Sequence, residues 1–356
     1  MQEVFMIVGF LLASYAIVAN DAIQTLGTFL SSNEKRPWWV LWLFACGILT
    51  FVMCWGYFIV GDVSYGRLGK FPLPEGGITW VQVVPPLFIL ALTRFGVPVS
   101  TTFLVLTVFH PGNLEDMLKK SLFGYALAFG CAYFIARFVV VALERRFLAS
   151  QKDGQAQIQT YWVYLQWCAT AWLWSQWLVQ DLANIFAYLP RELSLLGFVM
   201  AIGVMYVLHA WIFYKRGGAI QKIVTSKTNM TDIRAATIID LQYGFVLFFF
   251  KELNDVPMST TWVFLGLLAG RELALTGALK HRKFKKAYAT CGRDAIKALI
   301  GLGISIGLAF ALPEIDRMIK GESSAKATIA KVEPAAQTTE IIIEQTKEPV
   351  EAPLNQ

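Results

Sequence analysis

Long segments that carry almost no charge constrain this chain more than any other feature of its sequence. Five of them cover residues 4–32, 38–60, 121–143, 161–189 and 194–214. Each could cross about 30 Å of hydrocarbon as an α-helix, which takes roughly 20 mainly apolar residues. Charged residues make up 16% of the chain, against about 25% in soluble domains. The sequence therefore predicts an all-α, polytopic membrane protein.

Two further apolar segments, residues 79–109 and 235–270, are each interrupted by a proline. Pro98 and Pro257 each lack a backbone donor and disfavour helix at the preceding residue, so a helix should break there. The flanking pieces of about a dozen residues are too short to cross a bilayer alone. We expect each segment to form a re-entrant helical hairpin, and residues 295–312 to form a sixth span.

The charges of the loops predict the orientation. With both hairpins re-entrant, four loops lie on one side of the membrane: residues 33–37, 144–160, 215–234 and 271–293. Three lie on the other side: residues 61–78, 111–120 and 190–193. The first set holds 17 Lys and Arg residues and the second holds 5. Because cytoplasmic loops are enriched in Lys and Arg, both termini should be extracytoplasmic, and the inner (cell) membrane is the expected location.

Other features exclude several classes of function. The five cysteines show no CxxC spacing, the three histidines are far apart, and no nucleophile–base pair stands out, so an enzyme or a metal centre has little support. The net charge of +6 does not indicate nucleic-acid binding, since loops of membrane proteins collect Lys and Arg. Residues 321–356 are rich in Glu, Thr, Ala and Pro, and we expect a disordered tail there.

Two polar motifs occur twice. "VANDAIQT" and "VQDLANIF" share the pattern amide–Asp–x–x–amide, and their Asp residues are 160 positions apart. "PVSTT" and "PMSTT" are 159 positions apart. Nearly equal offsets indicate an internal duplication, with residues 1–150 and 161–320 each holding three spans and one hairpin. An odd number of crossings inverts the second copy, as recurs in secondary transporters with a substrate site near the midplane.

The cost of the Asp residues argues for a function. One Asp near the bilayer centre costs about 2.5–3.5 kcal/mol on insertion scales. Two would be hard to retain without a cation, a proton or a water-filled cavity. The carboxylates and their neighbouring amides offer oxygen ligands for Na⁺ or a site for a proton. These residues are Asn20, Asp21, Gln24, Gln180, Asp181 and Asn184.

The repeated S-T-T triplets should begin the second helix of each hairpin. Hydroxyl side chains cap helix N-termini well, and free backbone N–H groups there form an anion site. Opposed hairpin ends would aim two such sites at one point. The residues concerned are Ser100, Thr101, Thr102, Ser259, Thr260 and Thr261. The alternative is that they serve only as helix caps.

These motifs resemble those of the inorganic phosphate transporter (PiT) family, which carries duplicated G-A-N-D-V-A-N-A and G-[IL]-P-V-S-T-T type motifs in inverted halves. The resemblance covers roughly residues 4–312. It implies symport of phosphate with Na⁺ or H⁺. It also implies a cation and substrate site at the two Asp motifs, an anion held by the S-T-T triplets, and a homodimer.

The sequence departs from the family pattern at several positions. Val18 replaces the Gly before Ala-Asn-Asp, and Gln24 and Gln180 replace Asn. Asp255 replaces the Gly of the second hairpin motif, close to Lys251 and Glu252, so we include Asp255 among the candidate cation ligands. Arg94, which has no counterpart in the second half, could balance the charge of the substrate; an ion pair or snorkelling is the alternative.

The predicted function is cation-coupled symport of inorganic phosphate by alternating access, with no cofactor beyond the coupling ion. Candidate substrate-binding residues are the S-T-T triplets, Gln24, Gln180 and Arg94; candidate cation ligands are Asn20, Asp21, Asp181, Asn184 and Asp255. Another oxyanion such as sulfate is an alternative substrate. A non-transporting sensor or assembly protein on the same fold is the alternative class.

Overall fold

A computed structural model gives the fold and describes residues 1–152, 160–227, 230–253, 258–279 and 284–345. It has two compact units, Met1–Phe310 and Ala311–Gln356. The described residues are helical and contain no strand, which confirms the all-α prediction. Helix α13 (Phe284–Gln345) begins in the first unit and continues into the second.

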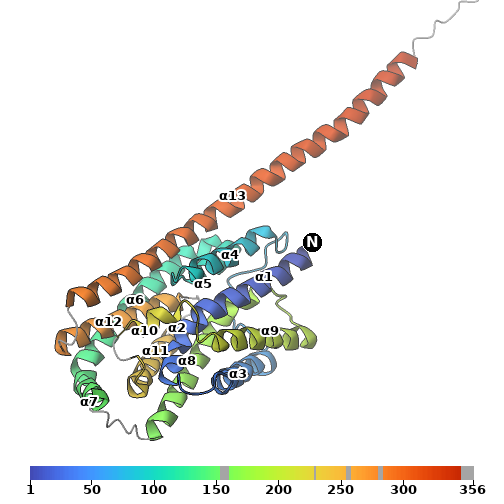
Figure 1. The fold of residues 1–356 in the computed structure, drawn as a ribbon. Helices are drawn as coiled ribbons and strands as arrows, with labels where there is room; N and C mark the ends of the chain where they lie inside the picture. Colours follow the sequence, from blue (N-terminus) through green and yellow to red (C-terminus); the bar gives the residue numbers. More distant parts are fainter. Residues whose placement is uncertain (153–159, 228–229, 254–257, 280–283, 346–356) are drawn as a thin grey trace, which may run out of the picture. The chain divides into compact units, whose positions relative to one another are not determined.

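The first half of the chain begins with α1 (Gln2–Ile17), a π-helical turn (Val18–Ala22) and α2 (Ile23–Ser32), which form one interrupted helix (Figure 1). Helix α3 (Trp38–Trp55) ends in a second π turn, Gly56–Val60. Helices α4 (Trp80–Arg94) and α5 (Thr101–Phe109) pack against each other, so the chain turns back between them. A short 3₁₀ turn (Pro111–Asn113) leads into α6 (Leu114–Ile135), a third π turn (Ala136–Val140) and α7 (Val141–Lys152).

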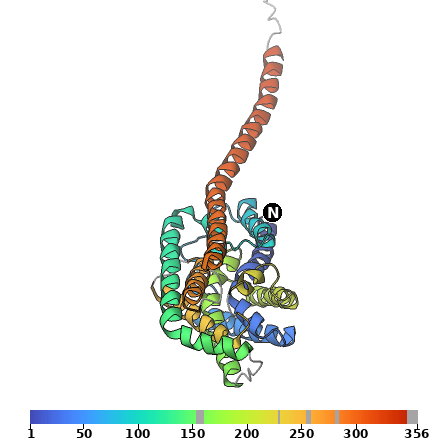
Figure 2. The same cartoon turned by 60° about the vertical axis from the view of Figure 1, so that its left-hand side comes forward.

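The second half follows a similar order of elements. Helix α8 (Thr160–Phe186) is followed by α9 (Leu195–Tyr214) and the short α10 (Gln221–Thr225). Helices α11 (Ile233–Leu253) and α12 (Thr260–Leu279) pack against each other, and α13 follows. Helices α3 and α9 lie side by side in both views (Figures 1 and 2). Helix α8 is largely buried from Gln166 to its end, and therefore forms the centre of the bundle.

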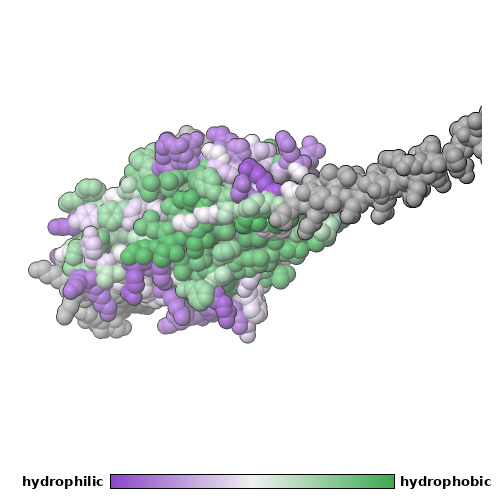
Figure 3. All heavy atoms as spheres, turned by 90° about the horizontal axis from the view of Figure 1, so that it is seen from above, coloured by the Kyte–Doolittle hydropathy of each residue, from purple (hydrophilic) through white to green (hydrophobic). Residues whose placement is uncertain are grey.

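An apolar surface surrounds much of the first unit. Among the described residues, seven helices are long and apolar enough to cross a membrane. Large apolar side chains such as Phe51, Phe138 and Val207 are 66%, 72% and 69% exposed. On the face shown in Figure 3 hydrophobic residues form a broad band, and hydrophilic residues lie along its two opposite edges. Such a surface is stable against hydrocarbon and not against water, so the chain is an integral, multi-pass membrane protein.

The second pair of helices is longer than the sequence indicated. Helices α11 and α12 contain 21 and 20 residues, and not about a dozen each. The expected hairpin ended at residue 270 because Arg271 and Glu272 were assigned to a loop. Both side chains are instead buried within α12, at 2% and 1% exposure. By contrast, α4 and α5 contain 15 and 9 residues, in line with the expectation for the first hairpin.

Three other boundaries differ from those expected. Helix begins at Pro111 rather than at residue 121, and α13 begins at Phe284 rather than at residue 295. Helix α13 also continues to Gln345, where a disordered tail was expected from residue 321. Ala and Glu, which are frequent in that segment, are strong helix formers. The low hydrophobicity of this segment thus predicted that it is polar but did not predict that its backbone is helical.

Close contact between two helices positions the second pair. A Cβ atom on Gly266 or Gly270 of α12 would lie 2.5 or 2.2 Å from a backbone carbonyl oxygen of α6, that of Tyr125 or Phe129. Only glycine fits at such distances. Small residues spaced four apart are typical of tightly packed membrane helices. The amide of Ser259, just before α12, also donates to Ser121 Oγ of α6 at 2.9 Å.

Candidate functional site

Asp21 lies in the π turn between α1 and α2, and its side chain is 2% exposed. Asn20 Nδ2 donates to Asp21 Oδ1 at 2.9 Å, and Gln24 Nε2 donates to the same oxygen at 3.1 Å. A π turn contains one residue more per turn than the α-helix and often occurs at functional sites. It brings Asn20 and Asp21 together into the interior, where Asn20 Nδ2 also reaches the Val99 carbonyl oxygen at 2.7 Å.

Asp181 lies on α8, and its side chain is 1% exposed. Asn184, three residues further on, donates from Nδ2 to Asp181 Oδ1 at 3.1 Å. The same nitrogen lies 3.2 Å from Thr101 Oγ1 and 3.1 Å from Thr102 Oγ1. Thr101 also donates to Asp21, so Asn184 and Thr101 link the two carboxylates. Thus one buried cluster contains both carboxylates.

The S-T-T triplets start α5 and α12, as the sequence predicted. Ser100 Oγ accepts from the Phe103 amide at 3.2 Å, and Ser259 Oγ accepts from the Trp262 amide at 3.3 Å. Each serine therefore caps its helix. The serines thus make a local contact within their own helix, whereas the threonine hydroxyls bond to other helices.

The four threonines contact the carboxylates in a crossed pattern. Asp21 accepts from Thr101 of α5 and, at 3.2 Å, from Thr261 of α12. Asp181 accepts from Thr260 of α12 at 2.6 Å and from Thr102 of α5 at 3.3 Å. Each carboxylate is therefore held by one hydroxyl from each of the two helix pairs. The candidate cation ligands and the candidate anion ligands form a single cluster.

Corresponding residues of the two halves make corresponding contacts. Thr261 Oγ1 lies 3.0 Å from the Val99 carbonyl oxygen, and Thr102 Oγ1 lies 3.4 Å from that of Met258. Gln24 and Asn184, 160 positions apart, each donate to their own Asp at 3.1 Å. The halves differ in the backbone at the motif, which is a π turn around Asp21 and a regular α-helix around Asp181.

Three amide oxygens in this region have no hydrogen-bond donor: Gln24 Oε1, Gln180 Oε1 and Asn184 Oδ1. All three side chains are at most 2% exposed. Buried acceptors are nearly always paired. Carboxylate, hydroxyl and amide oxygens are the ligands that hard cations prefer, so this cluster has the composition of a site for such a cation. Gln180 points its nitrogen to the Leu247 carbonyl oxygen at 2.7 Å, which leaves the oxygen for another contact.

One predicted site residue lies apart from this cluster. Arg94 is an exposed residue at the end of α4. Among the described residues, it takes part in none of the hydrogen bonds made by Asp21 and Asp181. Asp255 lies outside the described residues.

A different arginine is near the carboxylates. Arg67, in the loop between α3 and α4, is 3% exposed and interacts electrostatically with Asp181. The sequence gave no reason to separate it from other loop arginines, since it belongs to neither repeated motif. Its burial and its position could be found only from the fold.

The loop that carries Arg67 is firmly held. Tyr65 Oη donates to the Val52 carbonyl oxygen at 2.6 Å, and burial raises the pKa of Tyr65 to about 12. Asp62 caps the turn by accepting from the amides of Ser64 and Gly66, both at 2.7 Å. Arg191 Nη2 donates to the Phe71 carbonyl oxygen at 2.7 Å. These contacts fix the backbone on both sides of Arg67.

No model of a known protein family matches the sequence, and no curated protein matches it. Comparison with solved structures finds a similar fold. The chain is similar to a sodium-dependent phosphate transporter. The TM-score is 0.59 at 15% sequence identity, over 89% of this chain and 99% of that chain. At this identity the likeness to the transporter concerns the fold.

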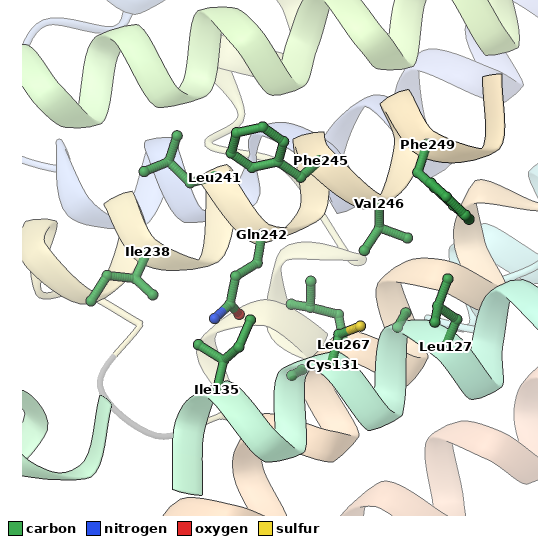
Figure 4. Close-up of a pocket in the computed structure, with 12 residues that line it drawn as sticks. Leu127, Cys131, Ile135, Ile238, Leu241, Gln242, Phe245, Val246, Phe249 and Leu267 are labelled. Atoms are coloured by element: carbon green, nitrogen blue, oxygen red, sulfur yellow. The ribbon is translucent and has the colours of Figure 1, made fainter. Parts of the chain in front are cut away.

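A groove of about 630 Å³ between α6, α11 and α12 has a different character (Figure 4). Eleven of its twelve lining side chains are apolar, and Gln242 is the polar one. Such a lining suits hydrocarbon and offers an ion no ligand set. The buried carboxylate cluster, and not this groove, therefore offers polar ligands.

Proposed function

We propose that this chain is a secondary transporter that carries inorganic phosphate together with a cation, Na⁺ or H⁺, by alternating access. The observation that carries the proposal is the sharing of hydroxyls between Asp21, Asp181 and both S-T-T triplets. The fold similarity to a sodium-dependent phosphate transporter supports it.

Charge balance gives the coupling its physical basis. Two buried carboxylates repel an anion, and the repulsion is strong where water is excluded. A cation bound between Asp21, Asp181 and the amide oxygens of Gln24 and Asn184 would cancel one of these two negative charges, and Arg67 would offset the other. The hydroxyls of the threonines could then turn from the carboxylates to the phosphate oxygens. Cation binding would thus come first and make anion binding favourable.

Arg67 supplies positive charge on the anion's side of this scheme. A buried guanidinium offers up to five donors in a planar fork that matches phosphate, and Arg67 already interacts with Asp181. Arg67 therefore takes the role that the sequence suggested for Arg94. The serines Ser100 and Ser259 act indirectly, by fixing the first turns of α5 and α12.

We further propose that residues 1–150 and 161–320 are inverted repeats. Support comes from contacts that recur at offsets of 159 and 160, namely the pairs Thr101–Asp21 and Thr260–Asp181, and Thr261–Val99 and Thr102–Met258. The distribution of Lys and Arg in the loops supports extracytoplasmic termini. Two hairpin ends meeting at one cluster fit a mechanism in which each half opens in turn.

Uptake into vesicles tests the proposed function. The purified protein is reconstituted into proteoliposomes, and labelled phosphate and sulfate are offered with Na⁺ and proton gradients applied separately. We expect phosphate uptake that depends on one of the two gradients. Uptake of sulfate alone would reassign the substrate. Absence of uptake for both anions under each gradient would contradict transport and favour a sensor or assembly role.

A further inference from the structure

A basic cavity lies beside the turn between α4 and α5. It has a volume of about 240 Å³ and is lined by residues of that turn, of the segment that contains α10 and of α13. Three of the lining residues are cationic: Lys222, Arg293 and Lys297. The charge distribution of the loops assigns α10 and the first residues of α13 to the cytoplasmic side. No residue of the central cluster lines this cavity, so a ligand held here is distinct from one held there.

Positive charge dominates the cavity. Its one acidic lining residue, Asp294, has an oxygen 2.7 Å from Lys227 Nζ, so these two charges largely cancel. Among the residues that the structure describes, no carboxylate oxygen lies within 4.0 Å of a side-chain nitrogen of Lys222, Arg293 or Lys297. Like charges gathered around one cavity repel one another. A bound anion would remove this repulsion, which makes an anion the favoured ligand.

The donors around the cavity suit a phosphate group. A guanidinium presents its N–H groups as a planar fork that binds phosphate oxygens in pairs, and an ammonium acts as a point charge. Lys297 Nζ donates to the Gly96 carbonyl oxygen at 3.0 Å, at the turn between α4 and α5. An ammonium has three donors, so Lys297 can hold Gly96 and a ligand together. Lys222 and Arg293 are exposed, so the cavity is accessible from outside.

Exposed apolar side chains adjoin these cations. Phe95, which lines the cavity, is 78% exposed, and Ile296 and Ile300 of α13 are 59% and 53% exposed. Arg293, Ile296 and Ile300 follow one another at spacings of three and four residues, so they share one face of α13. Apolar side chains exposed on a membrane protein lie against hydrocarbon. The cavity therefore adjoins both hydrocarbon and water, where basic pockets between helices bind the head groups of anionic lipids.

We propose that Lys222, Arg293 and Lys297 form a binding site for the phosphate group of an anionic molecule at the cytoplasmic surface of the membrane. Two sources supply this group there: the head group of an anionic phospholipid, and inorganic phosphate in solution. The exposed apolar side chains beside the cations favour the lipid, because its acyl chains would cover them. Inorganic phosphate would use the cations alone.

Binding at this cavity would act on the first helix pair. The ligand would link α10 to α13 through the three cations. One of these, Lys297, holds the turn at Gly96. Helix α5 begins shortly after this turn, and its threonines bond the two central carboxylates. An occupied cavity would thus fix the turn and with it the start of α5. An effect on transport rests on the proposed function, whereas the binding of a phosphate group does not.

Two binding measurements on the purified full chain in detergent test the site. Native mass spectrometry counts retained phosphatidylglycerol, with phosphatidylcholine, which has no net charge, as the comparison. Equilibrium binding counts labelled inorganic phosphate per chain with no lipid added. Both are made on the wild type and on a cavity variant that carries Lys222→Gln, Arg293→Gln and Lys297→Gln. We expect the cavity variant to bind phosphatidylglycerol about a hundredfold more weakly, since each cation next to an anionic lipid contributes about fivefold.

A matched control removes three positive charges elsewhere on the same side of the membrane. It carries Lys35→Gln, Lys285→Gln and Lys286→Gln, three exposed residues that do not line the cavity. This control should bind both probes as the wild type does. If the cavity variant folds poorly, Arg293→Gln alone decides the question, because Arg293 is exposed. This single change should weaken binding about fivefold.

The outcomes separate the two sources of the phosphate group and this proposal from the proposed function. A loss confined to phosphatidylglycerol identifies the lipid, and the loss of one inorganic phosphate per chain identifies the free anion. Equal binding of both probes by the wild type and the cavity variant would overturn the site, as would an equal loss in the control. That result would overturn the site even in a chain that transports phosphate. A loss specific to the cavity variant, in a chain without phosphate uptake, would retain the site and overturn transport.

Discussion

Replacing Asp21 by Asn removes one negative charge from the central cluster while keeping nearly the same shape. The wild-type carboxylate accepts from Asn20, Gln24, Thr101 and Thr261. A monovalent cation about 4 Å from a carboxylate gains about 4 kcal/mol at an effective dielectric constant of about 20. Because about 1.4 kcal/mol corresponds to a factor of ten, Asp21→Asn should weaken binding of the coupling cation on the order of a thousandfold.

Two measurements check this expectation. Phosphate uptake by proteoliposomes should fall close to background at cation concentrations that saturate the wild type. Thermal unfolding without coupling ions should occur at an unchanged or higher temperature, because the amide removes a buried charge. Glu115→Gln serves as the control, since this exposed residue of α6 forms only a surface ion pair with Lys119. Wild-type uptake at wild-type cation affinity in Asp21→Asn would refute the reasoning and make Asp21 a structural residue.

Three further predictions concern other parts of the structure. Arg67→Gln should raise the KM for phosphate about ten- to hundredfold, with Na⁺ binding unweakened because a positive charge that acts on Asp181 is removed. Arg67→Lys should restore part of the loss, as uptake kinetics would show. Gly270→Ala should lower the free energy of unfolding in detergent by about 1–3 kcal/mol, because its Cβ would lie 2.2 Å from a carbonyl oxygen of α6. Gly277→Ala, whose Cβ would have its nearest neighbour 3.8 Å away, should leave that stability unchanged or raise it by up to about 1 kcal/mol. Asp294→Asn should cost about 3–5 kcal/mol in the same assay, because it leaves Lys227, whose side chain is 2% exposed, without the carboxylate 2.7 Å away. Removing both charges with apolar residues should recover most of this stability.

The sequence identified most members of the central cluster because the free-energy cost of placing a carboxylate in an apolar segment can be inferred without a structure. An Asp in an apolar segment needs an explanation, and two at a fixed offset need a shared one. The S-T-T triplets followed from helix capping, and Ser100 and Ser259 do cap α5 and α12. Four of the five long uncharged segments likewise contain helices that are long and apolar enough to cross a membrane. These inferences depend on local composition and spacing, which a sequence states directly.

The remaining features depend on contacts between distant segments. The crossed pattern in which Thr261 reaches Asp21 spans 240 positions, and no local rule predicts it. Arg67 belongs to neither repeated motif, so nothing in the sequence distinguishes it from other loop arginines. The π turn around Asp21 also has no recognisable signature in the sequence. Helix α12 was cut short because the buried residues Arg271 and Glu272 resemble a loop in composition.

The contact of Gly266 and Gly270 with α6 has a mechanical consequence. Helices that pack through interdigitating side chains can shift as those side chains change rotamer. Here a backbone carbonyl of α6 lies directly against a Cα of α12, so the two helices have no space in which to shift relative to each other. The Ser259 amide, just before α12, also donates a hydrogen bond to Ser121 Oγ of α6. Helices α6 and α12 should therefore move together as one rigid unit, with Thr260 and Thr261 at the end of α12 that contacts the carboxylates. In the proposed alternating-access mechanism, the contacts that change would therefore lie between this helix pair and the rest of the bundle.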